Sequence, residues 1–100
     1  MELPNLQMDF ETYNDEELIL RAFECVQKAL DLDPMATYLD KLNVIRLYDN
    51  LAVQFNGDEE LMRHWVRTGN RHLGFTPYLC IHNPAHLAEM NEYLESFRYR

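Results

Sequence analysis

The sequence predicts an all-α protein, a compact bundle of about four or five helices. Apolar residues recur at intervals of three and four along most of the chain, as on one face of an α-helix. Residue types that begin and end helices separate these stretches. No stretch alternates between apolar and polar residues with a period of two, so we expect no sheet.

Length and composition fit one soluble domain. The chain has 100 residues, of which 47% are hydrophobic and 26% charged. No apolar run reaches the roughly 20 residues of a membrane helix. The start, Met1-Glu2-Leu3-Pro4, lacks the basic and apolar regions of a signal peptide. We therefore expect a cytoplasmic protein without membrane contact, in which Cys25 and Cys80 stay reduced.

The formal charge of −8 is unevenly placed. Residues 1–60 carry a net −10 and residues 61–100 a net +2. A nucleic-acid-binding module normally presents a basic face to the phosphates, and the first 60 residues have the opposite charge. We expect a solvated acidic face and no direct binding to nucleic acid.

The first part of the chain is predicted to be an arm followed by a helix. Residues 1–13 contain Pro4 and lack helical periodicity, so they form an N-terminal arm before a single helical domain over 14–100. Asn14 is a good N-cap for a helix over 14–32. Its apolar stripe comprises Ile19, Phe23, Val26 and Leu30. Pro34 is expected to end this helix, because it restricts Asp33 and cannot continue the hydrogen bonding.

A second helix is predicted over residues 36–55, with Gly57 as its stop. Its apolar stripe comprises Tyr38, Leu42, Ile45 and Leu51. The stripe is wide, which indicates a central helix in contact with several others. The same width could serve a homodimer, so the oligomeric state stays open.

Asp58 is predicted to cap a third helix that ends at Gly69, with Trp65 as a core anchor. The apolar face of this helix comprises Leu61, Met62, Trp65 and Val66. A connector follows over residues 70–75.

Two Thr/Asn-Pro pairs then predict two more helix starts. Thr76-Pro77 begins a short helix, and Asn83-Pro84 begins the last helix, over 84–97. The core face of the last helix comprises Leu87, Met90, Leu94 and Phe97.

The sequence offers no convincing catalytic or metal site, so neither an enzyme nor a cofactor is predicted. The three glycines are expected at helix ends and connectors, where they act as caps and do not cradle a phosphate. His82 and His86 have a spacing that suits a metal only on one helix, and a helix is expected to begin between them. A site that adds Cys80 to these histidines is the weaker alternative to solvated or interface histidines.

Residues 40–100 resemble the toxin-binding domain of Xre/MbcA/ParS-type antitoxins. The order and spacing of several short runs carry this resemblance: Leu47-Tyr48-Asp49-Asn50-Leu51, Phe55-Asn56-Gly57-Asp58-Glu59-Glu60, Trp65-Val66-Arg67-Thr68-Gly69-Asn70, Leu73-Gly74, Thr76-Pro77, Tyr93-Leu94 and Phe97-Arg98-Tyr99-Arg100. The residues that carry its structural motif here are Trp65, Asn70, Leu73, Gly74 and Pro77. We expect Gly69-Asn70 to supply a left-handed residue and Leu73-Gly74 to let the backbone pass close to Trp65.

The resemblance implies a function and a partner. Antitoxins of this type bind a RES-domain toxin that degrades NAD, and their C-terminus can obstruct the entrance to its active site. On this chain the toxin-binding residues would be Tyr93, Phe97, Arg98, Tyr99 and Arg100.

The chain also departs from the family. Phe75 follows Leu73-Gly74 where a second Gly is usual, Gly69 stands where Pro is common, and Pro84-Ala85 replaces an acidic residue and Gly. Too few residues precede the matching region for the family's DNA-binding helix-turn-helix. We therefore expect a short antitoxin. The alternatives are a transcriptional regulator that uses the fold for dimerisation and an unrelated structural or adaptor bundle.

Overall fold

The computed structural model describes residues 15–98 and confirms the all-α fold class. It contains five helices in this range and no strand: α1 (Asp15–Ala29), α2 (Lys41–Gln54), α3 (Glu59–Arg67), α4 (Pro77–Cys80) and α5 (Pro84–Glu95). The predicted arm over 1–13, the Asn14 N-cap, and Tyr99 and Arg100 lie outside the described residues.

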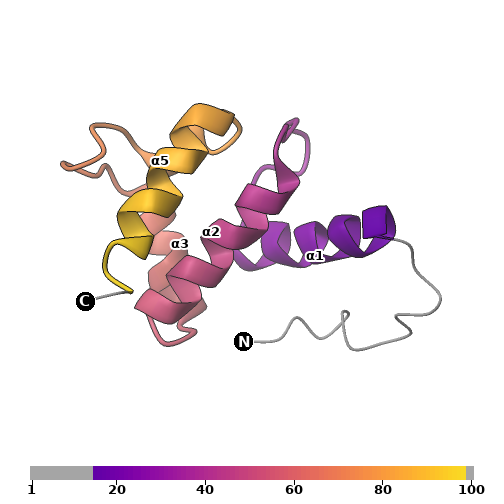
Figure 1. Cartoon of the computed structure of the whole chain (residues 1–100), viewed down its shortest axis with the longest axis horizontal. Helices are drawn as coiled ribbons and strands as arrows, with labels where there is room; N and C mark the ends of the chain where they lie inside the picture. The colour runs from indigo at the N-terminus through magenta and orange to yellow at the C-terminus, as the bar shows by residue number, and fades with distance from the viewer. Residues whose placement is uncertain (1–14, 99–100) are drawn as a thin grey trace.

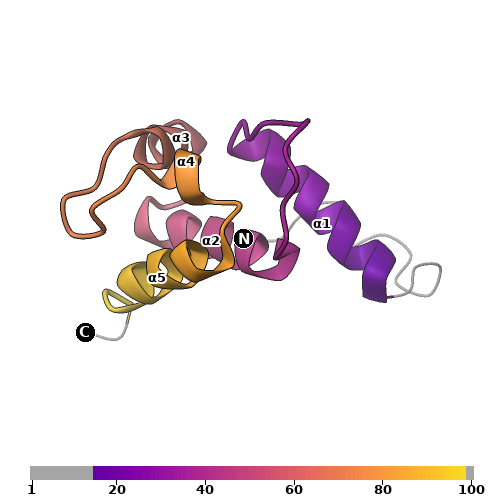
Figure 2. The ribbon, with the colours of Figure 1, turned by 90° about the horizontal axis from the view of Figure 1, so that it is seen from above.

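Helix α2 is the centre of the bundle, as predicted. It packs against α5, α1 and α3, while α4 joins α3 to α5. Figures 1 and 2 show α1 on one side of α2 and α5 on the other. Within residues 15–98, no helix combines the length and apolar character needed to cross a bilayer.

One apolar core joins the helices. Its fully buried members include Val26, Leu30, Val44, Leu47, Leu51, Met62, Val66, Leu87 and Met90. The core face predicted for the last helix is confirmed for Leu87, Met90 and Leu94. Phe97 was wrongly assigned to that face. Helix α5 ends at Glu95, so Phe97 lies in the following turn and is 38% exposed.

The end of α1 differs from the prediction. The helix stops at Ala29, short of residue 32, because Asp31 adopts a left-handed conformation with φ 53°. The Leu32 N–H donates to the Gln27 carbonyl at 2.9 Å and the Asp31 N–H to the Lys28 carbonyl at 3.1 Å. These two bonds form a Schellman motif, and Leu32 after it is buried. The helix therefore ends before Pro34 can act on it.

Helix α2 starts at Lys41 and not near residue 36. Asp40 is its N-cap and accepts from the Asn43 N–H at 3.1 Å. Before it, the Asp33 carboxylate accepts from the Met35 N–H at 2.9 Å, and Tyr38 stacks on Phe23. These side-chain bonds and the buried Tyr38 hold the segment in a turn that competes with helix formation.

The predicted stripe of α2 was therefore partly wrong. Leu39 and Leu42 are 73% and 60% exposed, and the buried face includes Val44, Leu47 and Leu51. The later start removes Tyr38 from the helix, although its ring is still buried in the core. At the other end Gly57 follows α2 as predicted, but Asn56 is already left-handed, with φ 54°.

Helix α3 begins after the predicted Asp58 cap, whose carboxylate accepts from the Glu60 and Leu61 N–H groups. It ends at Arg67, with Thr68 as C-cap, slightly before the predicted Gly69. Met62 and Val66 are buried, whereas Leu61, predicted on the same face, is 48% exposed.

The two proline starts are confirmed. Pro77 begins α4 and Pro84 begins α5. Asn83 caps α5 by accepting from the Ala85 N–H at 2.9 Å, while the Thr76 side chain makes no such bond to α4.

Candidate functional site

The predicted toxin-binding residues that the structure describes gather at the carboxyl end of α5. Tyr93 is half-buried on the helix, and Phe97 and Arg98 are exposed in the turn that follows it. Tyr99 and Arg100, which complete the set, lie outside the described residues.

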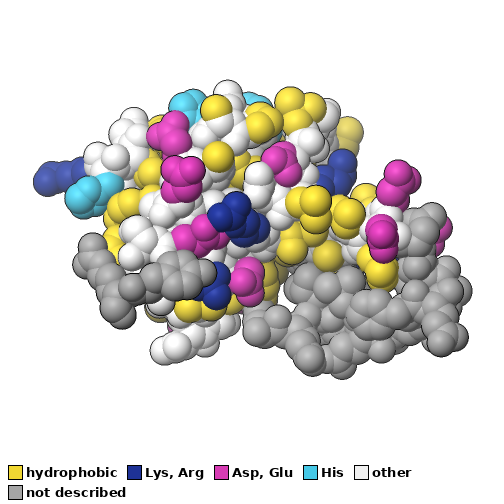
Figure 3. Space-filling view, in the orientation of Figure 1, with side chains coloured by type: hydrophobic (Ala, Val, Ile, Leu, Met, Phe, Trp, Pro, Cys, Tyr) yellow, Lys and Arg dark blue, Asp and Glu magenta, His cyan; other side chains and the backbone are white. Residues whose placement is uncertain are grey.

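Aromatic rings line one side of this end. The Tyr93 ring contacts Phe97 edge-on, with centroids 5.1 Å apart, and stacks on His72 at 5.6 Å. We call His72, Tyr93 and Phe97 the aromatic ridge. Nearer the start of α5, His86 packs on Phe75 at 4.6 Å. The α3–α4 connector and α5 therefore form one continuous surface, and Figure 3 shows histidine and basic side chains where the connector projects.

Asn70 closes the connector into a compact turn. Its carbonyl accepts from the Gly74 N–H at 2.8 Å, and its side-chain oxygen accepts from the His72 and Leu73 N–H groups. The Asn70 N–H in turn donates to the Phe75 carbonyl at 3.1 Å. The turn fixes the position of His72 against Tyr93.

Two expectations for this connector were wrong. The left-handed residue is Gly74, with φ 80°, and neither Gly69 nor Asn70 has a positive φ. A Cβ added to Gly74 would meet no atom within 4 Å. The glycine is thus required by its backbone conformation and not by a close approach to Trp65.

The remaining motif residues support the site from below. Trp65 and Leu73 are half-buried and pack against the outside of the core. Pro77 is buried at the start of α4. They support the connector, and only Pro77 is withdrawn from the surface.

On the other side of the end of α5, two buried amides join it to α2. Asn50 is 1% exposed and Asn91 is fully buried. The Asn50 Nδ2 donates to the Asn91 Oδ1 at 3.0 Å, and the Asn91 Nδ2 donates to the Asn43 carbonyl at 3.1 Å. Each amide thus satisfies the other inside the core, where an unpaired polar group is costly.

Charged side chains continue this network to the surface. The Asn50 Nδ2 also donates to the Glu95 Oε2 at 2.8 Å, and Arg46 makes a two-bonded ion pair with Glu95. The Arg46 hydrogen bond lowers the pKa of Glu95, with smaller contributions from Asn50 and Arg98. The middle of the face in Figure 3 accordingly shows acidic and basic side chains side by side.

The sequence analysis missed this network, although a signal for it exists. Asn91 lies four residues after Leu87 and three before Leu94, on the apolar stripe of the last helix. Asn50 lies three residues after Leu47, on the apolar stripe of α2. A polar residue on each of two apolar stripes indicates a buried pair, but spacing alone does not show that the two helices face each other.

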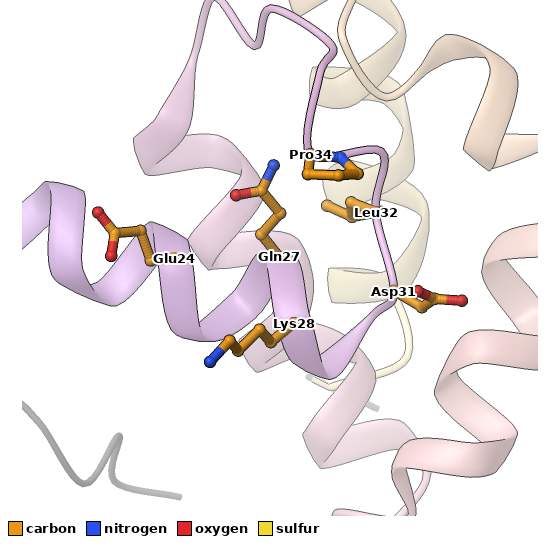
Figure 4. A pocket seen from close by; sticks show the side chains of 6 residues that line it. All are labelled: Glu24, Gln27, Lys28, Asp31, Leu32 and Pro34. Carbon is orange, nitrogen blue, oxygen red and sulfur yellow. The ribbon is translucent and has the colours of Figure 1, made fainter.

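Residues 15–98 contain no group of three or more His, Cys, Asp or Glu side chains that could hold a metal ion. Cys25 and Cys80 are half-buried and are not joined in a disulfide. The hollow beside the end of α1, about 390 Å³ in volume, is lined by Glu24, Gln27, Lys28, Asp31, Leu32 and Pro34. Figure 4 shows that these side chains point in different directions and do not converge on a common point. We therefore take the end of α5 as the candidate site.

No protein-family model and no curated protein matches this chain.

Proposed function

We propose that this chain is an antitoxin-like binding protein that neutralises a RES-domain, NAD-degrading toxin. The C-terminal helix and tail would occlude the active site of the toxin. The resemblance of residues 40–100 to the antitoxin toxin-binding domain supports this proposal, and so does the location of Tyr93, Phe97 and Arg98 at one exposed end of the fold.

The main structural support for this proposal is the aromatic ridge beside Arg98. Aromatic residues and arginine are enriched where proteins bind one another. Aromatic rings offer a large contact area with few rotatable bonds, and the guanidinium offers several hydrogen-bond donors. Phe97 is 38% exposed although it is a large apolar residue. The ridge and Arg98 thus present a surface suited to a protein partner at the end of the last helix.

The test is inhibition of a co-expressed RES-domain NADase encoded beside this chain. The full chain should form a stable complex with the toxin and abolish NAD loss. Deletion of residues 98–100 should leave the complex largely intact, because the ridge remains, and should restore most of the NADase activity. The control is Lys28→Ala, which changes an exposed residue of α1, far along the chain from α5. This variant should inhibit the toxin as strongly as the wild type.

Several outcomes would reject the proposal. Unchanged inhibition after the deletion excludes the tail as the occluding element. Failure of the full chain to bind or inhibit the toxin favours an unrelated adaptor bundle. Salt-dependent binding to operator DNA favours a transcriptional regulator, which the acidic charge of residues 1–60 opposes.

A further inference from the structure

The Arg98 side chain folds back onto α2. Its Nη1 lies 2.7 Å from the Asn50 Oδ1 and 3.5 Å from the Asp49 Oδ2. Asn50 is almost completely buried, whereas the Arg98 side chain remains 31% exposed. The arginine therefore covers a buried acceptor from the solvent side.

Asn50 cannot easily turn away from Arg98. Its amide has two N–H groups, which donate to the Asn91 Oδ1 and the Glu95 Oε2. With both N–H groups engaged, the Oδ1 is held toward Arg98. A flipped amide would place its donors against the guanidinium, which has only donors itself. The packing of α5 on α2 thus holds the Asn50 Oδ1 in a position to accept from Arg98.

We propose that Asn50 and Asp49 form a latch that holds Arg98 on α2, and that Arg98 is a positioning residue for the carboxyl end of α5, which meets the partner. The role toward a partner rests on the proposed function. The latch is a property of the free protein and is measured without a partner.

Such a latch would favour binding by ordering the end of the chain in advance. A hydrogen bond to a charged group is stronger than one between neutral groups, and this one is shielded on one side by the core. Fixing the tail before binding removes part of the ordering cost that a free terminus would add to association.

Trypsin provides the test, because it must take the Arg98 side chain into its own pocket to cut the Arg98–Tyr99 bond. Residues 1–14 contain no Lys or Arg, so the amino-terminal segment adds no competing site. The rate is read by mass spectrometry as loss of the Tyr99-Arg100 dipeptide from the folded full-length chain. Cleavage through an opened latch is proportional to the open population when opening is fast.

Asn50→Leu keeps the branched shape of the side chain and removes the acceptor. It should raise the cleavage rate about tenfold, as expected for a lost hydrogen bond to a charged group. Asp49→Asn, at an exposed position, should raise it about twofold. Met62→Ala, which lowers stability elsewhere in the core, and Glu92→Gln, an exposed charge change on α5, should leave the rate at about the wild-type value.

The latch is overturned if folded Asn50→Leu is cut less than threefold faster than wild type, or if Met62→Ala is cut as fast as Asn50→Leu. If circular dichroism shows that Asn50→Leu does not fold, Asp49→Asn decides: a cleavage rate equal to that of Glu92→Gln overturns the latch.

Failure of the wild type to inhibit a RES-domain NADase would reject the proposed function and leave the trypsin result standing. Where the wild type does inhibit, a folded Asn50→Leu should inhibit at least threefold more weakly, and equal inhibition overturns the positioning role.

Discussion

Asn91 is the most deeply buried polar side chain of the described residues, and it makes hydrogen bonds to two groups of α2. It accepts from Asn50 and donates to the Asn43 carbonyl, so the pair links α5 to α2 at one defined position. A slip of α5 by one residue would bury both amides without partners. The pair therefore favours a single packing of the two helices over slipped alternatives.

Truncation of one member should be costly. Asn91→Ala leaves Asn50 and the Asn43 carbonyl short of a partner and should lower the free energy of unfolding by about 1–3 kcal/mol. The double variant Asn50→Leu/Asn91→Leu replaces both amides with apolar groups of similar volume and should be less destabilised than Asn91→Ala. Urea unfolding measures both. If the double variant loses as much stability as the single variants Asn50→Leu and Asn91→Leu together, the two amides do not satisfy each other.

Glu95 makes the free energy of unfolding depend on pH in the acidic range. Its pKa is lowered in the folded chain, chiefly by Arg46, so its stabilising effect is complete above the pKa of an unfolded glutamate and is lost as the pH falls through the folded value. Stability should therefore decline below about pH 5, the region of unfolded glutamate side chains. Glu95→Gln should flatten this decline, with Glu92→Gln as the exposed control. Thermal unfolding between neutral and acid pH gives the comparison, and parallel curves for wild type and Glu95→Gln would refute it.

At the scale of elements, both α1 and α2 end on a left-handed residue that is not glycine. Asp31 has φ 53° after α1 and Asn56 has φ 54° after α2. The Gly57 N–H donates to the Ala52 carbonyl at 2.8 Å, so α2 ends on the six-residue bond of a Schellman motif. Asn tolerates the left-handed region better than most residues, and Gly tolerates it best.

Asn56 therefore allows a paired prediction. Asn56→Gly should raise the free energy of unfolding or leave it unchanged, because glycine has no Cβ to strain the left-handed conformation. Asn56→Ala should lower it by about 1 kcal/mol, because alanine keeps the Cβ and lacks the polar side chain that helps Asn to adopt this conformation. Asn56 is exposed, so packing contributes little to the difference. The two variants are compared by urea unfolding. Equal stability of both would mean that this residue does not require a left-handed backbone.

The elements also show what the sequence could and could not predict. Helix starts that depend on a local side chain, such as Asp58 and Asn83-Pro84, were placed correctly, because the capping residue is adjacent to the turn that it stabilises. The start of α2 was misplaced because Tyr38 is buried against Phe23, a residue on another helix. The site residues Tyr93 and Phe97 came from a sequence pattern, but the contact of Tyr93 with His72 and the bond from Arg98 to Asn50 depend on tertiary packing.

At the scale of the whole molecule, two arginines of α3 tie α1 to the rest of the fold. The Arg63 Nη1 donates to the Ala29 carbonyl at 2.9 Å, and the Arg67 Nη2 donates to the Asp31 carbonyl. These acceptors belong to the end of α1, where carbonyls lack helical partners and the helix dipole favours a cation. The arginines thus complete a cap that α1 cannot make alone.

Arg67 is the better test of this connection because it joins three elements. Besides the Asp31 carbonyl it pairs with the Asp31 carboxylate at 3.3 Å, and its guanidinium lies 4.3 Å from the Tyr78 ring centroid on α4. Arg67→Ala should lower the free energy of unfolding by about 1–2 kcal/mol, because a charged hydrogen bond and a cation–π contact are lost together. Arg67→Lys should recover less than half of that loss, since an ammonium cannot donate in a fork and stack on a ring at once.

The matched control is Arg71→Ala, which removes the same charge from an exposed arginine of the neighbouring connector and should change stability by less than about 0.5 kcal/mol. Hydrogen exchange adds a local measurement: amides in the last turn of α1 should exchange faster in Arg67→Ala, while those of α5 keep their protection. If Arg67→Ala and Arg71→Ala lose equal stability, Arg67 does not contribute to holding α1. If Arg67→Lys matches the wild type, only the charge is needed, and the planar geometry over Tyr78 contributes nothing.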